Sequence, residues 1–132
     1  MTVTAIVPLI YVADADRSLA FYAGLLGFEL VQRTAPDAGY FWGQLESGSA
    51  RLMINSVGDD LESKTATLPD DFGCVLYLAV DDVHALHRHL VAGGLTVSAP
   101  TTQDYGLDQL WLRDPDGYQL CCTSPSNGRD EA

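Results

Sequence analysis

An internal repeat constrains the fold of this chain more than any other feature. Segments 9–30 and 77–97 share one plan: an apolar strand, an acidic residue, an amphipathic helix, a glycine and a second short apolar strand. Asp14 and Asp82 stand at equivalent points, and each is expected to cap the helix that follows it. The chain is therefore predicted to contain the same structural unit twice.

The later part of each unit repeats as well. Residues 40–56 and 108–124 both read as strand, turn and strand, with Gly48 and Gly117 in the turns. Together with the first pair of segments, they predict two βαβββ modules and an α+β fold.

Polar composition marks the module boundaries. The first module is expected over residues 1–56 and the second over 72–124. Residues 57–71, rich in Gly, Ser, Thr, Pro and acids, are predicted to form a polar linker, and residues 125–132 a flexible tail.

Charge and composition exclude several classes of partner. The 132 residues include 18 acidic and 7 basic ones, giving a net charge of −11. Nucleic acid and anionic lipid need a positive surface, so neither is expected, whereas a cationic ligand is compatible. No apolar run approaches the roughly 20 residues of a membrane span, and the N-terminus does not resemble a signal peptide. Three cysteines, two of them adjacent, do not form a disulfide framework, which favours a cytoplasmic location.

Two motifs resemble a known family. They are V-x-D-x-x-x-S-x-x-F-Y-x-x-x-L-G-F over residues 12–28 and R-D-P-D-G-Y over residues 113–118. In both, the sequence is similar to the vicinal oxygen chelate superfamily, which includes glyoxalase I, extradiol dioxygenases, fosfomycin-resistance enzymes and bleomycin-resistance proteins. The resemblance implies a curved mixed β-sheet around a cavity, helices on its outer face, and a homodimer.

The resemblance also bears on metal binding. Family members with a metal use a His or similar residue near the start of each module's first strand and a Glu or similar residue on each last strand. The matching positions here are Val7, Met53, Val75 and Cys121. Only Cys121 is a plausible ligand, and one thiolate cannot hold a catalytic Zn, Ni, Mn or Fe. The chain is therefore closest in character to the metal-free, bleomycin-resistance branch, with no metal and no cofactor expected.

Strand alternation divides the side chains between two faces. The helix-facing core is predicted to contain Ile6, Pro8, Ile10, Val12, Leu52, Ile54, Leu76, Leu78, Val80, Leu120 and Cys122. The cavity face is predicted to contain Val7, Leu9, Tyr11, Tyr40, Trp42, Gln44, Arg51, Met53, Asn55, Val75, Tyr77, Ala79, Trp111, Arg113, Gln119, Cys121 and Thr123.

Aromatic side chains on the cavity face suggest a small-molecule site. Flat rings suit planar or cationic ligands through stacking and cation–π contact, although they also suit a dimer seam. The predicted ligand-binding residues are Tyr40, Trp42, Met53, Tyr105, Trp111, Arg113 and Cys121, and no catalytic residue is assigned.

Several residues leave alternatives open. Cys121 is read as pocket lining, because no His at a matched cavity position would activate it as a nucleophile. His84 and His87 on the second helix either bind adventitious metal or form a solvated helix surface. The acids Asp70, Asp71, Asp104 and Asp108 either attract a cationic ligand or are solvated loop residues.

The favoured function is thus metal-independent binding of a small molecule. The main alternative is a lyase, isomerase or dioxygenase of the same superfamily. It would use metal ligands such as Asn55 or Gln119, or metal-free acid–base chemistry by Tyr105, Tyr11 or Cys121. A third alternative is a module that binds another protein.

Overall fold

The computed structural model describes residues 1–56 and 72–126. The predicted linker, 57–71, and the tail beyond residue 126 lie outside the described residues. The chain divides into two compact units, Met1–Leu68 and Pro69–Ala132. Within the described residues, no helix has the length and apolar character that a membrane crossing demands.

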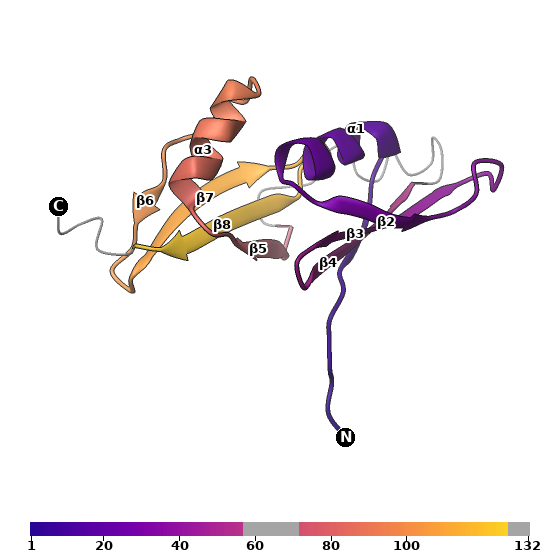
Figure 1. Ribbon diagram of the computed structural model, residues 1–132, viewed down its shortest axis with the longest axis horizontal. Helices are drawn as coiled ribbons and strands as arrows, with labels where there is room; N and C mark the ends of the chain where they lie inside the picture. Colours follow the sequence, from indigo (N-terminus) through magenta and orange to yellow (C-terminus); the bar gives the residue numbers. More distant parts are fainter. Residues whose placement is uncertain (57–71, 127–132) are drawn as a thin grey trace. The chain divides into compact units, whose positions relative to one another are not determined.

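Each unit is a four-stranded mixed sheet with a helix over one face (Figure 1). The first unit contains β1 (Leu9–Tyr11), α1 (Ala15–Leu19), its π-helical continuation η1 (Ala20–Leu25), β2 (Glu29–Arg33), β3 (Phe41–Ser47) and β4 (Ala50–Ser56). The second contains β5 (Val75–Ala79), α3 (Val83–Ala92), β6 (Thr101–Thr102), β7 (Leu107–Arg113) and β8 (Gln119–Pro125).

The two sheets have the same topology. Their strand orders are β1-β4-β3-β2 and β5-β8-β7-β6, and the first strand of each unit runs parallel to the last. The remaining pairs are antiparallel. This arrangement confirms the predicted α+β class and the duplicated βαβββ plan.

The predicted helix caps are present in both units. The Asp14 carboxylate accepts a hydrogen bond from the backbone N–H of Arg17 at 3.2 Å. The Asp82 carboxylate accepts from His84 N at 3.0 Å and Ala85 N at 3.3 Å. Each carboxylate thereby satisfies first-turn N–H groups that have no partner within the helix, which fixes where the helix begins.

The R-D-P-D-G-Y motif forms the turn between β7 and β8. The Asp114 carboxylate accepts from the backbone N–H groups of Asp116 and Tyr118, at 2.9 and 2.8 Å. Gly117 has φ of +97°, a conformation that glycine adopts without strain. The motif is thus explained by turn geometry, since it returns the chain into the central strand of the second sheet.

Strand alternation places the core as predicted in the central strands, β4 and β8. Leu52 and Ile54 are buried on one face of the first sheet, and Leu120 and Cys122 are buried in the second. One core prediction is wrong, because Ile6 is 84% exposed. The sheet begins where Pro8 O accepts from Met53 N at 2.8 Å, and the chain before Pro8 runs away from it (Figure 1).

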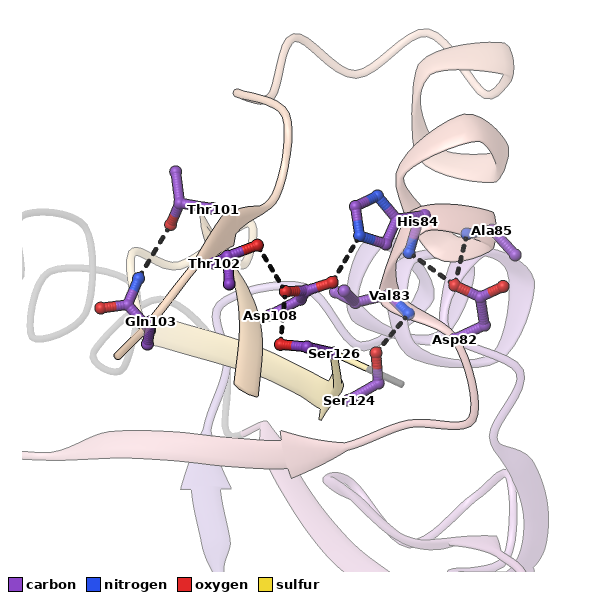
Figure 2. Close-up of polar contacts among 10 residues, drawn as sticks. All are labelled: Asp82, Val83, His84, Ala85, Thr101, Thr102, Gln103, Asp108, Ser124 and Ser126. Carbon is purple, nitrogen blue, oxygen red and sulfur yellow. Dashed lines mark hydrogen bonds and ion pairs between the residues drawn. The ribbon is translucent and has the colours of Figure 1, made fainter. Parts of the chain in front are cut away.

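A buried carboxylate joins α3 to its sheet (Figure 2). Asp108 in β7 is fully buried, and its carboxylate contacts His84 Nε2 at 2.7 Å. It also accepts from the hydroxyls of Thr102, at 2.8 Å, and Ser126, at 3.0 Å. The carboxylate therefore ties the helix, the edge strand β6 and the residue after β8 to one point.

These contacts correct two readings of the sequence. Asp108 is not a solvated loop acid, because it lies inside β7 with no exposed surface. His84 and His87 do not form a solvated helix surface: His84 faces Asp108, and His87 Nε2 lies 3.3 Å from Val97 O. Asp104 is exposed as expected, whereas Asp70 and Asp71 lie outside the described residues.

The Asp108 contacts predict how stability depends on pH. The His84 hydrogen bond, followed by those from the hydroxyls, lowers the pKa of Asp108 below its usual value. The unfolded chain then binds a proton more readily than the folded one. Stability from Asp108 is complete above the ordinary carboxyl pKa of about 4 and is lost as the pH falls from there through the folded pKa.

We expect Asp108→Asn to lower the free energy of unfolding at pH 7 by about 1–3 kcal/mol, because hydrogen bonds to a buried acceptor are lost. Below about pH 4, the free energy of unfolding of the variant should also fall less steeply with pH than that of wild type. Urea denaturation across pH measures both effects, with the exposed Asp104→Asn as the control. Identical acid dependence in Asp108→Asn and wild type would contradict the role of this carboxylate.

Candidate functional site

The face of each sheet opposite the buried core carries exposed side chains, and cross-strand pairing arranges them in rows. In the second unit, the middle row contains Tyr77 on β5, Cys121 on β8 and Trp111 on β7. Tyr77 is 62% exposed and Trp111 is 46% exposed, whereas Cys121 is fully buried between them. Two aromatic rings therefore flank a thiol at the centre of an open sheet face.

The two rings of this row contact each other. Their centroids are 6.0 Å apart and their planes meet at 79°, an edge-to-face arrangement. Tyr77 and Cys121 also affect each other's pKa. The proximity of Cys121, followed by burial, raises the pKa of Tyr77 above its usual value, so Tyr77 stays protonated at neutral pH.

A second row extends the site. It contains Thr123 on β8 and Gln109 on β7, both buried. The Tyr105 hydroxyl donates to Gln109 Oε1 at 2.6 Å, which fixes this exposed ring beside the row. Tyr105 also makes a small electrostatic contribution to the raised pKa of Tyr77.

The structure thus brings together three of the predicted ligand-binding residues, Tyr105, Trp111 and Cys121. Arg113 shares the face of Trp111, and its Nη1 donates to Gly117 O at 2.9 Å, at the turn that ends β7. Sequence reasoning left Tyr77 and Gln109 out of the set. Gln109 lies two positions before Trp111 on β7 and therefore shares its face. This even spacing is the sequence signal that identifies Gln109.

In the first unit, the predicted residues Trp42 and Met53 lie on one sheet face. One row contains Tyr11, Asn55 and Trp42, and the neighbouring row contains Leu9, Met53 and Gln44. Trp42 and Met53 are half-buried.

Tyr40 is exposed and lies in the loop before β3, where its backbone oxygen accepts from the Thr34 hydroxyl at 3.1 Å. The two tryptophans occupy different rows of their modules: Trp42 stands opposite Asn55, whereas Trp111 stands opposite Cys121.

The four positions that match the family's metal ligands do not fit a metal ion. Val7 and Val75 have no donor atom, and Met53 offers only a thioether. Within residues 1–56 and 72–126, no group of three His, Cys, Asp or Glu side chains converges to hold a cation. We therefore derive no chemistry from a metal at these positions.

The two adjacent thiols are poor nucleophiles. Burial raises the pKa of Cys121, an effect that Tyr77 opposes. Burial, reinforced by Cys121, raises the pKa of Cys122 to about 12. Because the thiolate is the reactive form, both side chains behave as small apolar groups at neutral pH.

Comparison with known proteins matches this architecture to one family. The model of the Glyoxalase/Bleomycin resistance protein/Dioxygenase superfamily matches residues 3–122. A protein from Synechocystis sp. (strain ATCC 27184 / PCC 6803 / Kazusa), named "Probable lactoylglutathione lyase", is 26% identical over 130 residues, covering 92% of this chain and 95% of that protein.

Two solved structures illustrate the similarity. TnmS3, an antibiotic binding protein from Streptomyces sp. CB03234, has a TM-score of 0.67 at 26% identity, covering 96% of this chain and 100% of that one. A glyoxylase/bleomycin resistance protein/dioxygenase domain from Frankia sp. EAN1pec has a TM-score of 0.74 at 18% identity, covering 97% and 95%. The second likeness is one of fold.

The burial of the thiols predicts a pattern of alkylation. In native protein treated with iodoacetamide near pH 8, we expect the exposed Cys74 to react while Cys121 and Cys122 react only after unfolding. Mass spectrometry of peptides measures this, and Cys74→Ser should take up no label while folded. Rapid native labelling of Cys121 would restore it as a candidate nucleophile.

Proposed function

The chain belongs to the Glyoxalase/Bleomycin resistance protein/Dioxygenase superfamily, and within it we propose that this protein binds a planar aromatic or cationic small molecule without a metal ion. The observation that supports this most directly is the exposed pair Tyr77 and Trp111, held edge to face above the sheet. Rings left open on a sheet face offer surface for stacking and for cation–π contact.

The other predicted residues complete this proposal. Tyr105 borders the pair, Cys121 lies beneath it, and Arg113 stands at the end of the same strand face. In the first unit, Trp42 and Met53 offer a second apolar surface, with Tyr40 in the adjoining loop. We propose that each of these two sheet faces contacts ligand through its own residues, with Cys121 lining the second face beneath the aromatic pair.

Charge and similarity support the same function. The net charge of −11 attracts a cation and repels anionic partners. TnmS3, which shares the fold at 26% identity, is named an antibiotic binding protein, and the absence of a fitting donor set at the metal positions favours binding over catalysis.

We also propose a homodimer in the cytoplasm. Val3 and Ile6, near the N-terminus, are exposed apolar side chains of the kind that interfaces cover. The free thiols of Cys74, Cys121 and Cys122 suit a reducing compartment.

We expect Trp111→Ala and Tyr77→Ala each to weaken binding of a planar cationic dye such as ethidium by about tenfold, because each removes one wall of the aromatic pair. Trp42→Ala should weaken binding as well. Phe72→Ala is the control: Phe72 is exposed to the same degree as Trp111 but packs on Tyr118 in the β7–β8 turn. Tryptophan fluorescence titration gives the dissociation constants, and unchanged affinity in Trp111→Ala and Trp42→Ala would argue against both sheet faces as binding surfaces.

Metal retention distinguishes binding from a lyase activity of the kind named for the Synechocystis relative. We expect protein loaded with Ni, Zn, Mn or Fe and then dialysed to retain far less than one ion per chain, because Val7, Met53, Val75 and Cys121 do not form a ligand set. Mass spectrometry of untagged protein measures this. Stoichiometric retention would favour the enzyme.

A further inference from the structure

The side chain of Asn55 contains an unusual buried atom. Among the residues that the structure describes, its Oδ1 is the buried side-chain oxygen or nitrogen that lacks a hydrogen-bond partner. The backbone of Asn55 is satisfied, since its carbonyl accepts from Val12 N at 2.9 Å. The unpaired acceptor is therefore confined to the side chain, near the end of the inner strand β4.

An acceptor of this kind raises the free energy of the folded protein. A buried carbonyl oxygen loses its bonds to water on folding and gains none in return. Unsatisfied groups are uncommon in folded proteins, and functional sites are among the places where they are retained. The position of Asn55, on the face opposite the buried Leu52 and Ile54, places the atom where a ligand is proposed to bind.

The duplicated module shows how such an acceptor is satisfied. In the second unit, Thr123 occupies the position of Asn55, and Gln109 lies opposite it. The Gln109 carboxamide oxygen accepts a hydrogen bond from the Tyr105 hydroxyl at 2.6 Å. An aromatic hydroxyl thus satisfies a carboxamide oxygen on the strand beside Thr123, whereas no residue that the structure describes donates to Asn55 Oδ1 in the first unit.

The neighbours of Asn55 suit an incoming aromatic ring. Tyr11 and Trp42 flank it on the adjacent strands, and Tyr11 is 49% exposed. Asn55 and Trp42 are half-buried, so both residues keep some exposed surface on this face although the oxygen itself is buried. A ring stacked on Trp42 brings a substituent to the oxygen across one strand spacing.

We propose that the ligand of this face is an aromatic molecule with a hydroxyl or N–H donor, and that the side-chain oxygen of Asn55 accepts that hydrogen bond. The inference rests on the proposed binding function and narrows its ligand class. Aromatic stacking holds the molecule, and Asn55 selects for the donor, because a ligand without one leaves the acceptor buried and unpaired.

Two matched probes test the selection. They are 2-naphthol and 2-methoxynaphthalene, which share the ring system and differ in whether the oxygen donates. We expect wild type to bind 2-naphthol about fivefold to tenfold more tightly, and Asn55→Leu to bind both probes equally. Fluorescence titration measures the four dissociation constants.

Stability of the unliganded protein gives a second readout, which does not depend on any probe. Asn55→Leu removes the unpaired acceptor, so its urea midpoint should equal or exceed that of wild type. A purely structural role would instead lower the midpoint. Asn55→Thr, which copies the second unit, tests the same selection should the leucine variant fold poorly, and its preference for 2-naphthol should also fall.

Ser56→Ala is the matched control. Ser56 follows Asn55 on β4, and its hydroxyl donates to Ala13 O at 3.4 Å. This variant should keep the preference for 2-naphthol. Equal binding of both probes to wild type, or a retained preference in Asn55→Leu, would overturn the role of Asn55 alone. No binding of either probe to wild type would count against the proposed function and against this inference with it.

Discussion

A single helix covers one face of each sheet and leaves the other face without a helix. The alternation of side chains along β4 and β8 determines which residues lie on each face. Residues of one parity pack toward the core, as Ile54 and Leu120 do. Residues of the other parity lie on the opposite face, where Trp111 and Tyr77 remain exposed. A one-residue shift in register would exchange the two sets, so the same pairing that forms the core also determines which side chains can meet a ligand.

The two modules share a scaffold but not a surface. Caps, turns, strand order and parallel edge pairing recur in both units. On the open face, however, Met53 in the first unit corresponds to Cys121 in the second, and Asn55 corresponds to Thr123. The modules therefore keep one scaffold while presenting different side chains on this face. The resulting side chains suit apolar contact and hydrogen bonding better than cation coordination.

Sequence periodicity predicted the elements well but not all the contacts between them. The repeat, the capping aspartates and the alternating strands are local signals, and the structure confirms the α+β modules that they indicate. The contact between His84 and Asp108 joins a helix to a strand 24 residues later, and no local pattern marks it. The full burial of Cys121 likewise depends on the size of Tyr77 and Trp111 on neighbouring strands. Parity gives the face of a residue, whereas its exposure is decided by what stands beside it.

In the proposed binding function, the acidic charge and the aromatic face act at different steps. Charge attraction between exposed groups is screened over about 8 Å in physiological salt, so the net charge of −11 chiefly affects how fast a cation arrives. Stacking and hydrogen bonding act only at contact and determine how long the ligand stays. A neutral ligand with a donor group would gain affinity from contact with Trp42 and Asn55 but no faster association from the charge. A cation would gain both the contact affinity and the faster association. Under the proposed binding function, the surface of the sheet, and not the overall charge, is therefore the feature that sets specificity.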